Sequence, residues 1–175
     1  CNGEEHGDTR RDNDERDVMW ARLRARHATA PFTLLLHGGD QIYADEATLA
    51  HPLMRDWPAH VPAITDPARL EEVSRALRAE FFRRYMRLVS RPDFAWLAAR
   101  VPSLAIWDDH DICDGWGSLL RGQERTPPGR ALFAAAREAF LLFQCGTVAA
   151  DLPPDRLDPS GGSLGWRADL PGLTL

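Results

Sequence analysis

Hydrophobic positions that recur every three or four residues predict four amphipathic helices along this chain. Two of these helices carry a start signal, because Asp66 can cap a helix that begins with Pro67, and Pro92 opens another. Arginines fill the other faces of the long helix that follows Pro67. The predicted helices run from Asp17 to about His27, from Asp66 to near Ser90, from Pro92 through Leu97, and from Arg130 to Cys145.

Three short, mostly apolar runs predict β-strands. The first run leads into the glycine turn Gly38-Gly39 and is typical of a central strand that is buried on both faces. The stretches 49–65 and 151–165 are rich in proline and other turn-forming residues, so we expect them to be irregular. Because strands and helices alternate, we predict an α/β fold in which helices flank a sheet. The strand candidates are Phe32–Leu36, Ser103–Trp107 and Leu173–Leu175.

Both ends of the chain indicate that a domain has been cut. The last residues follow Pro171-Gly172 and are typical of a strand that is just beginning. A sheet with long exposed apolar edges would aggregate, so we expect the three strands to pair with strands outside this sequence. We therefore interpret residues 1–175 as part of a larger domain that continues in both directions.

Composition narrows the function without identifying it. The 175 residues, 44% apolar and 27% charged, are typical of one globular domain. All 21 basic residues are arginines interleaved with acids, and the net charge of −5 argues against a broad nucleic-acid surface. The chain has no uninterrupted apolar run of membrane-spanning length. The odd, widely spaced set Cys1, Cys113 and Cys145 predicts neither a disulfide framework nor a structural zinc site. Composition indicates neither a compartment nor an oligomeric state.

Two polar clusters follow the first two predicted strands, where α/β sheets carry their functional sites. The first cluster, His37–Asp45, contains a Gly-Gly-Asp turn, which either presents Asp40 to a ligand or simply ends the strand. The second, from Asp108 to Asp114, holds four acids and a histidine within seven positions. These charges would repel one another unless a cation or hydrogen bonds offset them, and a divalent metal is the simplest answer. A solvated acidic turn is the alternative, although it would not need the flanking Trp107 and Trp116.

The two clusters together resemble a known family. The sequences Gly39-Asp40-Gln41-Ile42-Tyr43 and Trp107-Asp108-Asp109-His110-Asp111 are similar to motifs of the PhoD-like, or alkaline phosphatase D, branch of the calcineurin-like metallophosphoesterases. In the wider superfamily the corresponding elements are a Gly-Asp turn and a Gly-Asn-His-Asp/Glu turn. Cys1-Asn2-Gly3 also resembles the opening segment of that branch. The resemblance implies that the chain is the N-terminal portion of a single metallophosphoesterase domain, an α/β sandwich with helices flanking the sheet.

The resemblance also implies roles for individual residues. Asp40 would bridge two metal ions, Tyr43 would bind iron as a phenolate, and Cys1 would bind iron as a thiolate. Asp109 would bind the second metal, and His110 would face the substrate phosphate, either protonating the leaving oxygen or stabilising the transition state. Two further acids of the second cluster would support the ligands rather than bind metal: Asp108 and Asp111.

The implied reaction is hydrolysis of a small phosphate monoester or diester by a metal-bound hydroxide. It needs two or more metal ions, iron with calcium or another divalent cation. The family completes its metal site with histidines late in the chain, whereas no histidine follows Ser118 here. Either the other ligands lie outside this sequence, which we expect, or the protein is an inactive metal-binding or interaction domain. A nucleophilic Asp40 or Asp108 is a further alternative, disfavoured because no strand leads into Asp-x-Asp.

Three lesser candidates remain. His51 and His60, in the proline-rich stretch, could line a substrate entrance or simply lie on the surface. Cys113 lies beside the acids and is expected to be a packed thiol rather than a nucleophile, since neighbouring carboxylates raise a thiol pKa.

Finally, Asp40 and Asp109 follow strands that should be neighbours, so we predict that their carboxylates lie close enough to share metal ions.

Overall fold

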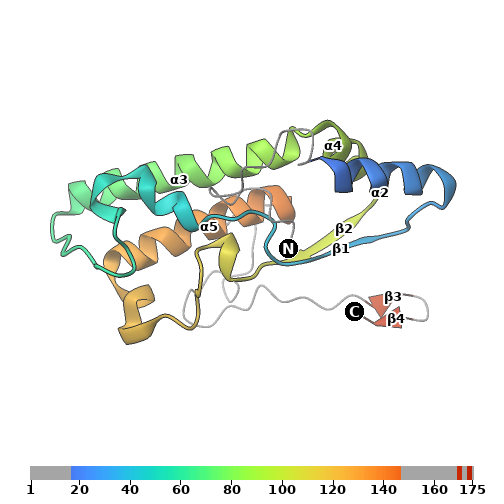
Figure 1. Cartoon of the computed structure of the whole chain (residues 1–175). Helices are drawn as coiled ribbons and strands as arrows, with labels where there is room; N and C mark the ends of the chain where they lie inside the picture. The colour runs from blue at the N-terminus through green and yellow to red at the C-terminus, as the bar shows by residue number, and fades with distance from the viewer. Residues whose placement is uncertain (1–16, 147–168, 171–172, 175) are drawn as a thin grey trace.

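The computed structural model describes residues 17–146, 169–170 and 173–174 (Figure 1). These residues form a helix-rich α/β fold with a two-stranded parallel sheet and a two-stranded antiparallel sheet, and the predicted sandwich is not confirmed by them. In chain order the elements are α2 (Val18–Thr29), β1 (Leu35–Gly38), the 3-10 helices η1 (Asp45–Ala50) and η2 (Pro52–Met54), α3 (Pro67–Val89), α4 (Pro92–Ala98), β2 (Ser103–Ile106), the 3-10 helices η3 (Asp109–Asp111) and η4 (Leu120–Arg125), α5 (Pro127–Gln144), β3 (Asp169–Leu170) and β4 (Leu173–Thr174).

The core lies between α3 and α5, which run side by side along the molecule (Figure 1). Their facing side chains recur at helical spacing and are fully or almost fully buried, as the sequence pattern predicts. A second contact joins α2 to α4, where the rings of Trp20 and Phe94 meet edge to face at 4.8 Å. The buried residues of the main helix pair are Val73, Leu77, Phe81, Tyr85, Leu132, Ala135, Ala136 and Phe140.

Helix starts follow the capping signals. Asp66 accepts a hydrogen bond from Ala68 N at 2.9 Å and is followed by Pro67, which confirms the predicted start of α3. Helix α5 begins at Pro127, three residues before the predicted start at Arg130. The reason is Thr126, whose hydroxyl accepts a hydrogen bond from Gly129 N at 3.2 Å. Among the described residues, no helix combines the length and the apolar character that crossing a membrane requires.

Strands β1 and β2 pair in parallel, with Leu35 opposite Ser103 and Gly38 opposite Ile106. The predicted first strand, Phe32–Leu36, starts too early. Phe32 instead donates its backbone N–H to His27 Nδ1 at 3.0 Å, and the ladder begins only where Leu35 N meets the carbonyl of Pro102. The parallel register brings the carboxyl ends of both strands to one edge of the sheet, which is where the two polar clusters begin.

The prediction that the first strand is buried on both faces is wrong for the described residues. Side chains alternate along a strand, so Leu36 and Ile106 share the face opposite Ala105. Leu36 is 58% exposed and Ile106 is 43% exposed, whereas Ala105 is buried. The helices gather on one side of the strand pair, so only one face of the sheet is covered by them (Figure 1).

The third predicted strand also forms. Leu173–Thr174 is strand β4, and it pairs in antiparallel fashion with Asp169–Leu170, which the sequence pattern did not predict. Each of the three predicted strands therefore has one partner within the described residues, and further strand partners outside this sequence stay a prediction. The irregular segment predicted at 151–165 lies outside the described residues.

Candidate metal centre

The two strand ends meet at Gly39 and Asp108. Gly39 has a φ of +105°, and a Cβ atom at this position would lie 2.6 Å from the Asp108 Cβ. Only glycine therefore allows the two turns to approach this closely. The next residue, Asp40, is 7% exposed and has a φ of +51°, a left-handed conformation that non-glycine residues rarely adopt. The backbone thus holds Asp40 in a strained position directly against the second cluster.

Substituting Gly39 tests this close approach. We expect Gly39→Ala to destabilise the protein by more than about 2 kcal/mol, because the new methyl group meets Asp108 and the backbone is left-handed. Gly38→Ala is the matched control, since a Cβ there meets nothing within 4 Å. Thermal or urea unfolding of both variants checks the prediction, and equal stability of the two would contradict it.

Three carboxylates gather where the turns meet. One oxygen each of Asp40, Asp108 and Asp109 lie within 4.8 Å of one another. This confirms the prediction that Asp40 and Asp109 lie close together, although they are far apart in the sequence. The structure also brings in Asp108, which the sequence assigned only a supporting role. Carboxylate oxygens are the donors that hard divalent cations prefer, so this donor set fits a metal ion.

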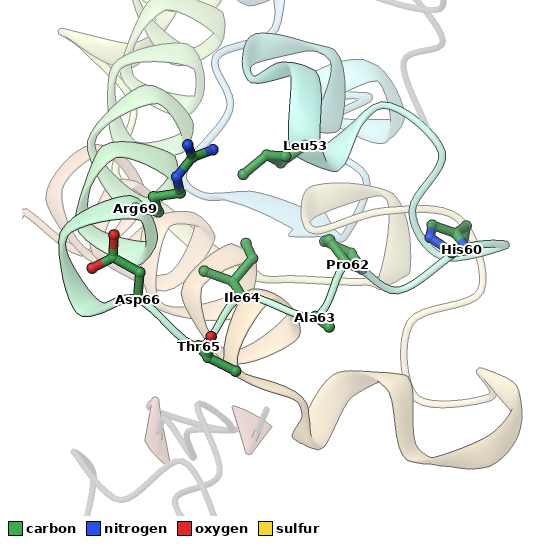
Figure 2. Close-up of a pocket in the computed structure, with 8 residues that line it drawn as sticks. All are labelled: Leu53, His60, Pro62, Ala63, Ile64, Thr65, Asp66 and Arg69. Carbon is green, nitrogen blue, oxygen red and sulfur yellow. The ribbon is translucent and has the colours of Figure 1, made fainter.

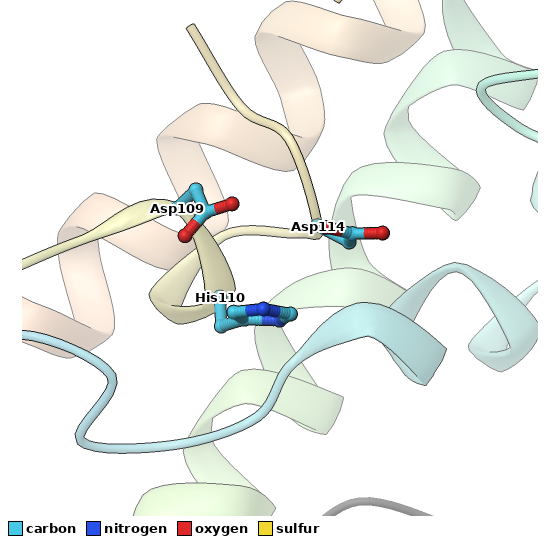
Figure 3. Close-up of side chains that lie close together, drawn as sticks. All are labelled: Asp109, His110 and Asp114. Atoms are coloured by element: carbon cyan, nitrogen blue, oxygen red, sulfur yellow. The ribbon is translucent and has the colours of Figure 1, made fainter. Parts of the chain in front are cut away.

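A second group of donors lies beside the first. Asp109, His110 and Asp114 each offer one ligand atom within 4.8 Å of the others (Figure 3). Asp109 and His110 belong to η3, and Asp114 follows it (Figure 3). Asp109 is common to both groups. Its Oδ2 also accepts a hydrogen bond from Gly115 N at 2.8 Å, which fixes the side chain.

Tyr43 lies against the same centre. Its hydroxyl is 3.4 Å from Asp40 Oδ2, and its ring is 4.6 Å from the His110 ring, centroid to centroid. Burial and then the charge of Asp40 raise the pKa of the Tyr43 phenol above its ordinary value. The phenol therefore keeps its proton at neutral pH unless a cation offsets the neighbouring carboxylates.

His110 is held by Asp45, which sequence reasoning missed as a site residue. His110 Nδ1 lies 2.9 Å and 3.0 Å from the two carboxylate oxygens of Asp45. A carboxylate only accepts, so Nδ1 carries the proton and Nε2 is left for a substrate. Burial alone would lower the pKa of His110, but the hydrogen bond and charge of Asp45 raise it above the ordinary value, aided by Asp109. A histidine that acts on a substrate usually donates its other ring N–H to an acceptor. A carboxylate on the neighbouring turn could therefore have been sought in the sequence.

The Asp111 side chain joins the two turns through hydrogen bonds to backbone N–H groups. It is 1% exposed, and its Oδ1 accepts hydrogen bonds from Gln41 N at 2.8 Å and Ile42 N at 3.1 Å. Its Oδ2 accepts a third from Asp108 N at 3.1 Å. Burial raises the pKa of this carboxyl to about 6, although the three backbone donors oppose the shift. The buried Asp111 side chain thus links the two clusters by hydrogen bonds, which is consistent with the supporting role expected from the sequence.

Two substitutions of Asp111 test this link between the clusters. Asp111→Ala removes the acceptor of three backbone N–H groups and should lower the free energy of unfolding by about 3 kcal/mol. Asp111→Asn keeps one oxygen and loses mainly the bond from Asp108 N, so it should cost about 1 kcal/mol. Denaturant unfolding of the two variants checks this order, and a larger loss for asparagine than for alanine would be inconsistent with it.

Aromatic packing anchors the acidic turn to helix α5. The Trp107 ring lies 5.4 Å from that of Phe133, and the Trp116 ring stacks on Phe133 at 5.6 Å. Cys113, between the two tryptophans in sequence, is 4% exposed, and burial raises the pKa of its thiol to about 12. It is a packed thiol, as predicted. Cys1, the expected thiolate ligand, lies outside the described residues.

A separate pocket of about 400 Å³ opens along the proline-rich stretch and the start of α3 (Figure 2). Its polar lining includes His60 and Arg69, and Leu53 and Ile64 supply apolar surface. Of the two histidines considered for a substrate entrance, His60 lines this pocket. His51 instead accepts a hydrogen bond from Leu53 N at 3.2 Å and caps η2. None of the candidate metal ligands lines the pocket.

Comparison with known proteins adds evidence that is independent of the geometry. The chain is 25% identical over 142 residues to the uncharacterized protein YGR266W of Saccharomyces cerevisiae, covering 72% of this chain. The match spans only 20% of the yeast protein, so this chain corresponds to about a fifth of its length. No solved structure matches the chain significantly. The family model for PhoD-like phosphatases matches residues 17–145, which include both polar clusters and the helices that carry them. The chain therefore belongs to the PhoD-like phosphatase family.

Proposed function

We propose that this protein hydrolyses phosphate esters, with its metal ions held at the ends of β1 and β2. The observation that carries the proposal is the cluster of Asp40, Asp108 and Asp109, whose carboxylate oxygens lie within 4.8 Å of one another beside a hydrogen-bonded histidine. Membership of the PhoD-like phosphatase family makes phosphate esters the substrate class to test first. The substrate itself, whether a monoester or a diester, is part of the proposal.

In this proposal, Asp40 would contribute to holding both metal ions, and Asp109 would hold the second. Tyr43 would bind iron, and calcium or another divalent cation would bind on the side of Asp108 and Asp109. Metal ions at such a site polarise the phosphoryl oxygens and lower the pKa of a water nucleophile. Asp111 keeps both turns in place through its three backbone hydrogen bonds.

His110 is proposed to act on the substrate phosphate through Nε2. Its side chain is 22% exposed, so a ligand in the open side of the centre can reach it. Asp45 holds Nδ1 and raises the pKa of the imidazole, which favours the protonated form. A protonated imidazole can donate a proton to the leaving oxygen or a hydrogen bond to a transferring phosphoryl group.

We also propose that the site and the sheet are completed by residues beyond this chain. The described donors are aspartates, one tyrosine and one histidine, whereas the sequence resemblance implies further histidine ligands. The exposed apolar face at Leu36 and Ile106 is where the second sheet of a metallophosphoesterase sandwich would pack. The related yeast protein is about five times longer than the matched region, which leaves ample chain for both.

Metal content and turnover of the full-length protein test the proposal together. After chelation and reconstitution with iron and calcium, we expect hydrolysis of bis(p-nitrophenyl) phosphate or of p-nitrophenyl phosphate to return with the metal. Metal binding without turnover would instead support an inactive metal-binding domain. Turnover that survives complete removal of metal would contradict the proposal and return Asp40 or Asp108 to consideration as a nucleophile.

A further inference from the structure

A buried arginine from helix α3 reaches the first turn of the candidate metal centre. The Arg84 side chain is only 4% exposed, which is unusual for a guanidinium group. Burying a cation is costly unless charged and polar partners replace the lost water. The contacts that Arg84 makes therefore show what its charge is used for.

Two of these partners are acids. Arg84 Nε donates to Glu80 Oε1 at 2.9 Å, one helical turn away on α3, and the guanidinium lies 3.7 Å from Glu46 Oε2 on η1. Glu80 is partly buried, and although burial would raise its pKa, hydrogen bonds and charge from Arg83 and Arg84 lower it below the ordinary value. The Glu80 carboxylate is thus ionised and holds the guanidinium in a fixed orientation.

The third partner belongs to the site. Arg84 Nη1 donates to the backbone carbonyl of Tyr43 at 2.5 Å, across 41 positions of sequence. The neighbouring N–H groups of this turn are bound by the second cluster, since Gln41 N and Ile42 N donate to Asp111 and Ala44 N donates to the carbonyl of His110. The turn that carries Asp40 and Tyr43 is consequently clamped between Asp111 and Arg84.

We propose that Arg84 is a positioning residue that sets Tyr43 for metal binding. This inference rests on the proposed function, in which Tyr43 is a metal ligand. The Tyr43 ring lies 4.6 Å from the His110 ring and its hydroxyl is 3.4 Å from Asp40, so a shift of the Tyr43 backbone moves the hydroxyl away from both. The planar fork of arginine can bind Glu80 and the carbonyl at once, whereas the single ammonium of lysine cannot reproduce that geometry.

The chain offers a matched control. Arg83 is the neighbouring residue on α3 and also pairs with Glu80, but its side chain is 44% exposed, whereas that of Arg84 is 4% exposed. Arg83→Met removes one arginine from the same carboxylate and leaves the hydrogen bond from Arg84 to the Tyr43 carbonyl in place. Arg84→Met removes the clamp, and Arg84→Lys keeps the buried charge while losing the fork.

The test uses full-length protein titrated with Fe(III), with the visible absorption of an iron-bound phenolate as the readout. We expect Arg84→Met to weaken iron binding by about tenfold or more, the loss for one charge-assisted hydrogen bond, and to shift or abolish the absorption. Arg84→Lys should show a smaller loss in the same direction, and Arg83→Met should match the wild type. Melting temperatures of the metal-free variants are measured alongside.

The outcomes separate this inference from the proposed function. A wild-type protein that binds iron without the visible absorption would show that Tyr43 is not a ligand, whatever Arg84 does. Unchanged iron affinity and absorption in Arg84→Met, with or without a lower melting temperature, would show that Arg84 is only structural. If Arg84→Met does not fold, Arg84→Lys decides, and wild-type behaviour of that variant would overturn the inference.

Discussion

Asp40→Asn in the full-length protein is expected to lower hydrolysis of a chromogenic phosphodiester by about a thousandfold or more while leaving the fold intact. The carboxylate of Asp40 lies within 4.8 Å of those of Asp108 and Asp109, and it is the one contributed by the first turn. An asparagine has nearly the same shape but lacks the negative charge that would bind two cations at once. Steady-state kinetics with a measured metal content give the result.

Asp56→Asn is the control for this substitution, because Asp56 is exposed, lies in the proline-rich stretch and belongs to neither acidic group. It should keep wild-type turnover and metal content. If Asp40→Asn retains activity close to that of Asp56→Asn, Asp40 is not a bridging ligand, and either a different residue acts as the nucleophile or the metal lies elsewhere.

The second large effect is expected at His110. His110→Ala should lower turnover by about a hundredfold to ten-thousandfold, the usual contribution of a general acid, while both metals stay bound. The reason is that Asp45 holds Nδ1 at 2.9 Å and leaves Nε2 for the substrate. Kinetics and metal analysis of the same preparation are needed, since the loss must occur without loss of metal.

Asp45→Asn refines this expectation. An asparagine at Asp45 can still accept a hydrogen bond from Nδ1 but no longer stabilises the imidazolium, so turnover should fall by less than in His110→Ala. Loss of metal together with activity in His110→Ala would instead identify His110 as a ligand. His110 lies close to Asp109 and Asp114, with which it could hold a cation. The metal content therefore distinguishes a ligand role from a catalytic role of His110.

The closeness of Asp40 and Asp109 could be predicted from the sequence because it follows from general rules. Each residue comes after a short apolar run, and the carboxyl ends of parallel neighbouring strands meet at one edge of a sheet. For the glycine before Asp40 the sequence left open whether the turn serves a ligand or ends the strand, and the structure shows a close approach to Asp108 instead. Such features depend on local pattern and on topology alone.

Other parts of the centre depend on tertiary contacts that no spacing reveals. Asp45 meets His110 only because η1 folds back over the second turn, and Arg84 meets Tyr43 only because α3 packs along η1. On the sequence, Arg84 is one of several arginines on an amphipathic helix, and the pattern does not mark it as buried. The sequence also did not predict the exposure of Leu36. An apolar run indicates that a strand face can be buried, but it does not show what buries that face.

The most direct test of the central claim is the position of the metal in a crystal of the full-length protein, located by anomalous scattering at the iron edge. We predict an iron peak bounded by Asp40 and Tyr43, with a second cation between Asp40 and Asp109. An iron peak that lies away from Asp40, or metal-loaded and active crystals with no cation between the two turns, would contradict it.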